Sequence, residues 1–234
     1  MLTRIAVVPY PPLLVPELTA GAASRTEPVR GACLRAVSSL TDATAEWVAV
    51  GVDHRGPTVF EPGTAGSFAG FGVDVPVTLG GEQPEQDPSL PLPALVTGWL
   101  REQAGARSAT VHLLDADTPA AEAAALGERF AAGDDVGLLV LAEGSDRRDE
   151  SSPHPPHPRA HEVDEQLREA LRDADAEALL GLDPQLCAEV GVRSRAAWQC
   201  AAGAAGGGGW RGELLHSATP HGVTYHVGVW SRTA

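Results

Sequence analysis

The stretch that decides the fold is VGLLVLA at residues 136–142, an unbroken apolar run near the middle of the chain. A short run of this kind is typical of a strand in a sheet that is covered on both faces. Residues 5–9 and 46–51 have the same character, and residues 24–40 between them repeat apolar side chains at helical spacing. This strand–helix–strand order predicts a βαβ unit with parallel strands.

The rest of the chain extends the same alternation. Helices are expected at residues 92–103, 118–132 (with Thr118 as N-cap and Pro119 as first helical residue), 161–172, 184–190 and 194–205, and strands at 73–79, 110–114, 210–216 and 221–230. Residues 52–72 and 80–91 read as irregular loops, because glycine, proline and polar residues dominate there. We therefore predict a single α/β domain over residues 1–234: three αβα layers, a mixed, mostly parallel central sheet and a C-terminal antiparallel hairpin.

Composition excludes several classes of function. The 234 residues carry a formal charge of −14, and all 17 basic side chains are arginine. A chain without lysine has neither a Schiff-base lysine nor a Walker-type phosphate lysine. No basic patch or long apolar run stands out, so neither nucleic acid nor a membrane is expected as partner. Three widely spaced cysteines fit no zinc motif or disulfide framework, which favours the reducing cytoplasm.

Polar side chains follow three of the expected strands at the point where each strand ends. They are Tyr10 after the first strand, Asp53 and His54 after the second, and Glu143, Ser145 and Asp146 after VGLLVLA. Ligands of open α/β sheets gather at the carboxyl ends of the strands. The sequence therefore predicts that a phenol, an imidazole and several carboxylates meet in one region.

The same segments resemble a known family. VVPYPPLLVPEL (7–18) is similar to the opening of class III extradiol ring-cleavage dioxygenases and their Memo-like relatives. The stretch from HRGP (54–57) to GSFAGFG (66–72), the segment LAEGSDRRDESSP (141–153) and the ending GVRS (191–194) with PHGVTY (220–225) follow in the family's order. The resemblance covers nearly the whole chain, and its opening and ending are its most specific parts.

The resemblance implies an iron(II) site that binds a small catecholic aromatic molecule and dioxygen. Such a site uses two histidines and a carboxylate, and a further histidine moves the proton of the substrate hydroxyl. The first metal histidine of the family falls on Tyr10, the second on His54, and the acid/base histidine on Asp146. A late metal-site cysteine of some relatives falls beside Glu189. The substrate pocket would take Glu143, Ser145, His221 and Tyr225.

Only His54 keeps the family's usual side chain among these positions. A tyrosine with a pKa of about 10 must lose its proton to bind metal well, and an aspartate with a pKa of about 4 is a poor acid at neutral pH. Two hypotheses follow. The chain is an iron(II) enzyme with a weakened metal site, or it is a relative without iron that uses the same fold for binding or assembly.

A proline-rich loop at residues 143–160 is typical of a lid over an active site. His154, His157 and His161 lie in it or at its end, in SPHPPHPRAH, where they are either solvated or able to replace a missing ligand. The C-terminal hairpin and residues 206–210 are candidate surfaces for self-association. Alternation along the expected last strand would place His221 and Tyr225 on one face.

Overall fold

The computed structural model describes residues 2–19, 23–81, 85–133, 135–206 and 208–233. Its main sheet has the strand order β3-β7-β2-β8-β1-β10-β9. In that order the bounds are Thr58–Phe60, Ser108–Leu114, Glu46–Val52, Gly137–Leu141, Arg4–Val8, Tyr225–Arg232 and Trp210–Ala218. The four strands β7, β2, β8 and β1 are parallel, while β3, β10 and β9 are antiparallel to their neighbours.

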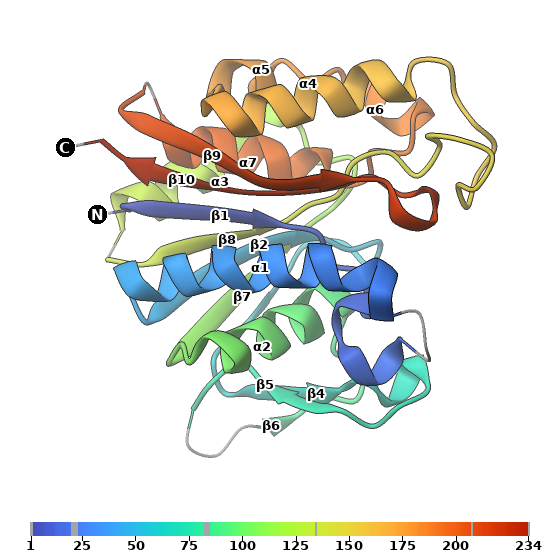
Figure 1. The fold of residues 1–234 in the computed structure, drawn as a ribbon. Helices are drawn as coiled ribbons and strands as arrows, with labels where there is room; N and C mark the ends of the chain where they lie inside the picture. Colours follow the sequence, from blue (N-terminus) through green and yellow to red (C-terminus); the bar gives the residue numbers. More distant parts are fainter. Residues whose placement is uncertain (1, 20–22, 82–84, 134, 207, 234) are drawn as a thin grey trace.

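Helices cover both faces of this sheet (Figure 1). On one face lie α1 (Ala23–Ala43) and α2 (Leu92–Ala104), and on the other α3 (Ala120–Ala132), α4 (Ala160–Asp173), α5 (Ala176–Leu180), α6 (Pro184–Glu189) and α7 (Arg195–Ala205). The predicted three-layer architecture with a mixed, mostly parallel sheet and a C-terminal antiparallel hairpin is confirmed.

Strand β8 explains why the central apolar run is so informative. All of its residues are buried. Leu138 and Val140 belong to the hydrophobic core beneath α3, α4 and α7, whereas Leu139 and Leu141 belong to the core beneath α1 and α2. Because successive side chains of a strand point to opposite faces, an unbroken apolar run fills both cores at once.

The structure corrects the expectation of irregular loops at residues 52–72 and 80–91. The first of these segments contains β3 at the edge of the main sheet, β4 (Thr64–Ser67) and a 3-10 turn at Phe68–Phe71. The strand expected at residues 73–79 is found as the shorter β5 (Pro76–Thr78). Strands β4 and β5 form a separate small sheet with β6 (Glu85–Gln86), next to α2 (Figure 1). Strands β3, β4 and β6 are too short to show the alternation on which sequence reasoning depends.

Three smaller expectations were wrong. Helix α3 begins at Ala120, with Pro119 in the capping position and no side-chain cap. Helix α5 was missed, because it spans only five residues and is marked only by its Asp175 cap. His221 lies in a 3-10 turn with a positive φ of 56°, and β10 begins only at Tyr225, so the two side chains do not alternate along one strand.

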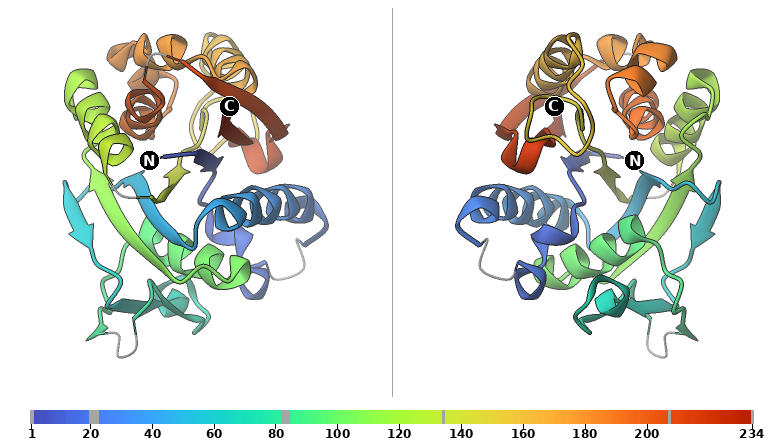
Figure 2. Two further views of the ribbon diagram at one scale, coloured as in Figure 1. Left: turned by 90° about the vertical axis from the view of Figure 1, so that its left-hand side faces the viewer. Right: turned by 90° about the vertical axis from the view of Figure 1, so that its right-hand side faces the viewer.

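The carboxyl ends of β1, β2, β7 and β8 meet at one edge of the sheet, on the right in Figure 1 and facing the viewer in the right panel of Figure 2. The loop before α4 contains no strand or helix, as predicted. It is fastened by the His157 N–H, which donates to the Arg147 carbonyl at 2.9 Å, and by the Ser152 hydroxyl, which donates to the Gly222 carbonyl at 2.6 Å. No helix in the described part of the chain has the length and apolar character that a membrane span requires.

Candidate functional site

A pocket of about 600 Å³ opens at the carboxyl edge of the sheet. Its apolar lining comes from Val52, Phe71, Leu90, Leu92 and Leu95 together with the prolines at 88, 91 and 93. Its polar lining comes from Tyr10, Asp53, His54, Arg55 and Arg193 with the hydroxyls of Ser67 and Ser89. Apolar walls with a few polar groups are typical of small-molecule sites, and the volume suits a ligand of one or two rings.

Tyr10 follows β1 and reaches this pocket from the centre of the sheet. Burial and the neighbouring Glu143 carboxylate raise the pKa of its phenol above the usual value. With no metal bound, the hydroxyl therefore stays protonated at neutral pH, although a side-chain hydrogen bond with Ser194 opposes part of the shift.

Glu143 lies directly behind Tyr10, at the end of β8. The Tyr10 backbone N–H donates to its carboxylate at 3.3 Å. Burial is the main reason why the pKa of Glu143 is raised to about 7. The hydrogen bond from Tyr10 lowers this pKa, whereas the Asp146 carboxylate raises it further. Burial and the charge of Glu143 also raise the pKa of Tyr225, which packs into the core nearby. The structure thus brings Tyr10, Glu143 and Tyr225 together.

Asp146 is the centre of a second group of charges. Its carboxylate accepts a hydrogen bond from Arg193 Nε at 2.9 Å and lies 3.1 Å from His154 Nδ1. The Asp146 carboxylate also packs directly against Gly191. A Cβ at residue 191 would lie 1.8 Å from Asp146 Oδ1, so only glycine leaves room for the carboxylate there. His154 is therefore the histidine of the 143–160 loop that reaches the site region, and it does so through Asp146.

Ser145 has a structural part in this region. It is buried, its hydroxyl donates to the Val190 carbonyl at 2.5 Å, and its N–H donates to Asp164 at 2.8 Å. Asp164 is also buried and accepts hydrogen bonds from Thr224 at 2.6 Å and Arg148 at 2.9 Å. These contacts fix the turn after β8 and engage both polar groups of Ser145, so its hydroxyl is not free to bind a ligand.

Three residues that the resemblance assigned to the site lie apart from this group. His54 lines the pocket but its side chain is 89% exposed, with Nδ1 3.8 Å from an Asp53 oxygen. Glu189 is exposed, accepts a hydrogen bond from Gln185 at 2.9 Å and lines a different surface hollow beside Arg159. His221 is exposed in its turn.

The residues present do not fit an iron(II) centre. Tyr10 is a protonated phenol, the His54 ring faces solvent, and the Asp146 carboxylate is already bound by an arginine. A guanidinium on a carboxylate competes with a metal ion for the same oxygens. Within the residues that the structure describes, no group of three His, Cys, Asp or Glu side chains is arranged to hold a metal.

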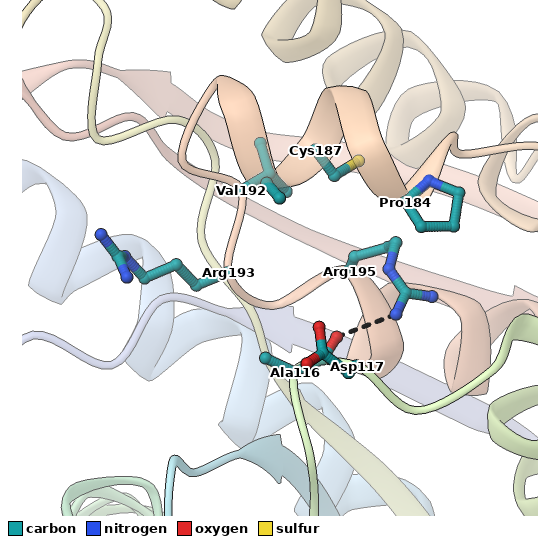
Figure 3. Close-up of a pocket in the computed structure, with 8 residues that line it drawn as sticks. Ala116, Asp117, Pro184, Cys187, Val192, Arg193 and Arg195 are labelled. Carbon is teal, nitrogen blue, oxygen red and sulfur yellow. Dashed lines mark hydrogen bonds between the residues drawn. The ribbon is translucent and has the colours of Figure 1, made fainter.

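A smaller pocket of about 200 Å³ adjoins the first, and Ala116 and Arg193 line both. Figure 3 shows Arg195 directed at the loop around Ala116, whereas the Arg193 guanidinium points away from this smaller pocket. Arg195 is buried and donates at 2.8 Å to the carbonyls of both Ala116 and Thr118. It fastens the loop after β7 to the start of α7.

Sequence reasoning missed the roles of Arg193, Asp164 and Phe71. Arg193 belongs to a segment that carries the resemblance, but nothing in the spacing of Arg193 or Asp164 indicates that the first bonds Asp146 and the second Ser145. For Phe71 the sequence does contain one signal, because an aromatic residue in a glycine-rich loop is not expected to be part of the hydrophobic core. In the structure the Phe71 side chain is 44% exposed and lines the pocket.

No family model matches this chain, and no curated protein matches it. Among solved structures it is similar to the crystal structure of uncharacterized protein JW3007 from Escherichia coli K12, with a TM-score of 0.60 and 13% sequence identity. The match covers 98% of this chain and 99% of that one. At this identity the similarity concerns the fold alone, and it extends over the full length of both chains.

Proposed function

We propose that this protein is a divergent relative of the class III extradiol dioxygenases that binds a small aromatic molecule and does so without iron chemistry. The observation that carries the proposal is the pocket at the carboxyl edge of the sheet, where Tyr10 and Phe71 face the same space. The fold, the place of the pocket and the resemblance of the sequence all support the same kind of ligand.

The lining suits an aromatic ring with a hydroxyl group. Phe71 and the neighbouring leucines and prolines offer flat apolar surface, against which a ring gains both burial and edge or face contacts. The protonated Tyr10 hydroxyl is a donor, and the Asp53 carboxylate is an acceptor. Burial by itself would raise the pKa of Asp53. The hydrogen bonds and charge of Arg55 outweigh burial and hold this pKa below its usual range, so the Asp53 acceptor is charged.

Small molecules are favoured over macromolecules as partners. The chain carries a formal charge of −14, which opposes binding to nucleic acid. A cytoplasmic location belongs to the same proposal, because Cys33, Cys187 and Cys200 are buried free thiols. Iron-dependent ring cleavage is the alternative, and the donor set around Tyr10, His54 and Asp146 argues against it.

The test is calorimetric titration with catechol in the presence of a chelator. We expect Phe71→Ala to weaken binding about 2- to 12-fold, since an aromatic contact contributes roughly 0.5–1.5 kcal/mol. Val73→Ala is the matched control, because Val73 is similarly exposed at 38% but lies outside the pocket lining. Equal affinities for both variants and the wild type would exclude this pocket as the binding site.

Metal analysis of the same protein, purified without chelator, tests the alternative. We expect far less than one iron per chain and no oxygen uptake with catechol. Stoichiometric iron that is lost in His54→Ala, together with oxygen uptake, would instead establish the dioxygenase.

A further inference from the structure

Arg193 has a position that the proposed pocket alone does not explain. It stands in the loop between α6 and α7, where it lines the larger pocket, and its guanidinium turns away from the smaller one (Figure 3). Its side chain is 63% exposed, so it is not there to fill a core. An exposed arginine beside a ligand pocket is available for recognition.

The guanidinium is held from one side only. Nε donates to Asp146 at 2.9 Å, and Nη2 lies 3.5 Å from His154 Nε2. In the described part of the chain, Nη1 has no hydrogen-bond acceptor within reach. Because Asp146 accepts the hydrogen bond from Nε, the guanidinium is oriented before a ligand binds. This lowers the loss of side-chain conformational entropy on binding.

The other arginine of the pocket is already more fully occupied. Arg55 donates from Nε to Asp53 at 2.8 Å and from Nη1 to the Ser89 carbonyl at 2.7 Å. Its charge is therefore balanced inside the pocket itself. Asp146, the counter-ion of Arg193, is shared with His154 and does not line the pocket. Arg193 is thus the pocket arginine whose counter-ion lies outside the pocket lining, and its guanidinium keeps an edge without a carboxylate partner in the described part of the chain.

We infer that the ligand of this pocket carries a carboxylate and that Arg193 binds it through the free edge of its guanidinium. This inference rests on the proposed function and names the class of ligand: a small aromatic acid. A single planar carboxylate matches one guanidinium edge in charge and geometry. A doubly charged phosphate would leave one charge unmatched next to Asp53, so the carboxylate is favoured.

The experiment compares two probes of the same size and shape, the anionic 4-hydroxybenzoate and the neutral 4-hydroxybenzamide, by titration calorimetry with chelator present. We expect wild-type protein to bind the benzoate about 10-fold more tightly, the usual scale for a charge-assisted hydrogen bond. The preference should shrink at high salt, because the Arg193 side chain is exposed to solvent.

Arg193→Gln should abolish the preference, because it weakens binding of the charged benzoate far more than binding of the neutral benzamide, and Arg193→Lys should restore part of it. The matched control is Arg107→Gln, since Arg107 is also exposed and also bonded to one carboxylate, Glu46 at 2.7 Å, but lies outside the pocket lining. The control should keep the wild-type preference.

The outcomes separate the inference from the proposed function. Equal binding of the two probes to wild type, or a preference that survives in Arg193→Gln, would overturn the role of Arg193 and leave the aromatic pocket standing. Failure of both probes to bind the wild type would overturn the pocket and the inference together.

Discussion

Glu143 follows the central strand β8, close enough to Tyr10 and Tyr225 for its charge to add to the effect of burial in raising the pKa of both phenols. Burial raises its pKa from an ordinary value of 4.5 to about 7. Its proton is therefore held more tightly in the folded than in the unfolded protein. The resulting stabilisation is complete below about pH 4.5 and is lost as the pH rises through about 7.

This residue gives a prediction about pH. Between about pH 5 and pH 8, the free energy of unfolding of the wild type should fall relative to that of Glu143→Gln, by about 1–3 kcal/mol. Glutamine keeps the shape of a protonated glutamic acid but has no charge to bury. Urea unfolding of both proteins across this range is the measurement, and two parallel pH profiles would contradict the assignment.

Individual residues also show how much of the candidate site could be predicted from the sequence. Six residues were expected in one region because each follows a strand and strand ends converge in a parallel sheet: Tyr10, Asp53, His54, Glu143, Ser145 and Asp146. The region is found, since Tyr10, Asp53 and His54 line the pocket, Glu143 lies behind Tyr10, and Asp146 is joined to the pocket through Arg193. The partnership of Asp146 with Arg193 and His154 depends on contacts between distant segments, which no local pattern encodes.

Among the elements, α3 and α7 pack with unusually little separation. Two glycines make this approach possible. A Cβ on Gly127 would lie 2.0 Å from the Cys200 carbonyl oxygen, and a Cβ on Gly203 would lie 2.1 Å from the Ala124 carbonyl oxygen. The backbones of the two helices are therefore in direct contact, and α7 in turn holds Arg195 and Trp198 beside the site.

The contact predicts opposite effects for one substitution at two helical glycines. Gly127→Ala should destabilise the protein by about 1–3 kcal/mol, because the methyl group overpacks the interface. Gly31→Ala in α1 should stabilise it by about 0.5–1 kcal/mol, since a Cβ there meets only the end of Arg35 at 3.8 Å and alanine favours a helix. Thermal unfolding of both variants is the measurement, and the same sign of change for both would refute the close packing of α3 and α7.

The long elements could be predicted and the short ones could not. Helix α4 repeats Val163, Leu167 and Leu171 along one face, and all three side chains are buried. Strands β3 and β4 have three and four residues, too few for a periodic signal, and β5 is shorter than the strand expected at residues 73–79. Their placement depends instead on β7 and α2, against which they pack.

At the scale of the whole molecule, charge and topology favour the same site. The strand order puts four parallel strands at the centre, so their carboxyl ends form one continuous edge. In a molecule with a formal charge of −14, two of the 17 basic residues, Arg55 and Arg193, line the pocket at that edge. The Arg193 guanidinium would give a small anionic ligand a charged partner there, whereas the net charge of the molecule opposes the approach of such a ligand.

The most direct measurement of the central claim is the affinity of wild-type protein for 4-hydroxybenzoate, a ligand with no pair of adjacent hydroxyls to chelate iron. Calorimetric titrations are run once with excess chelator and once under argon with added iron(II). We predict measurable binding with the same dissociation constant under both conditions, because Tyr10, Phe71 and Arg193 make the site. Binding that appears only with iron, or under neither condition, would contradict the claim.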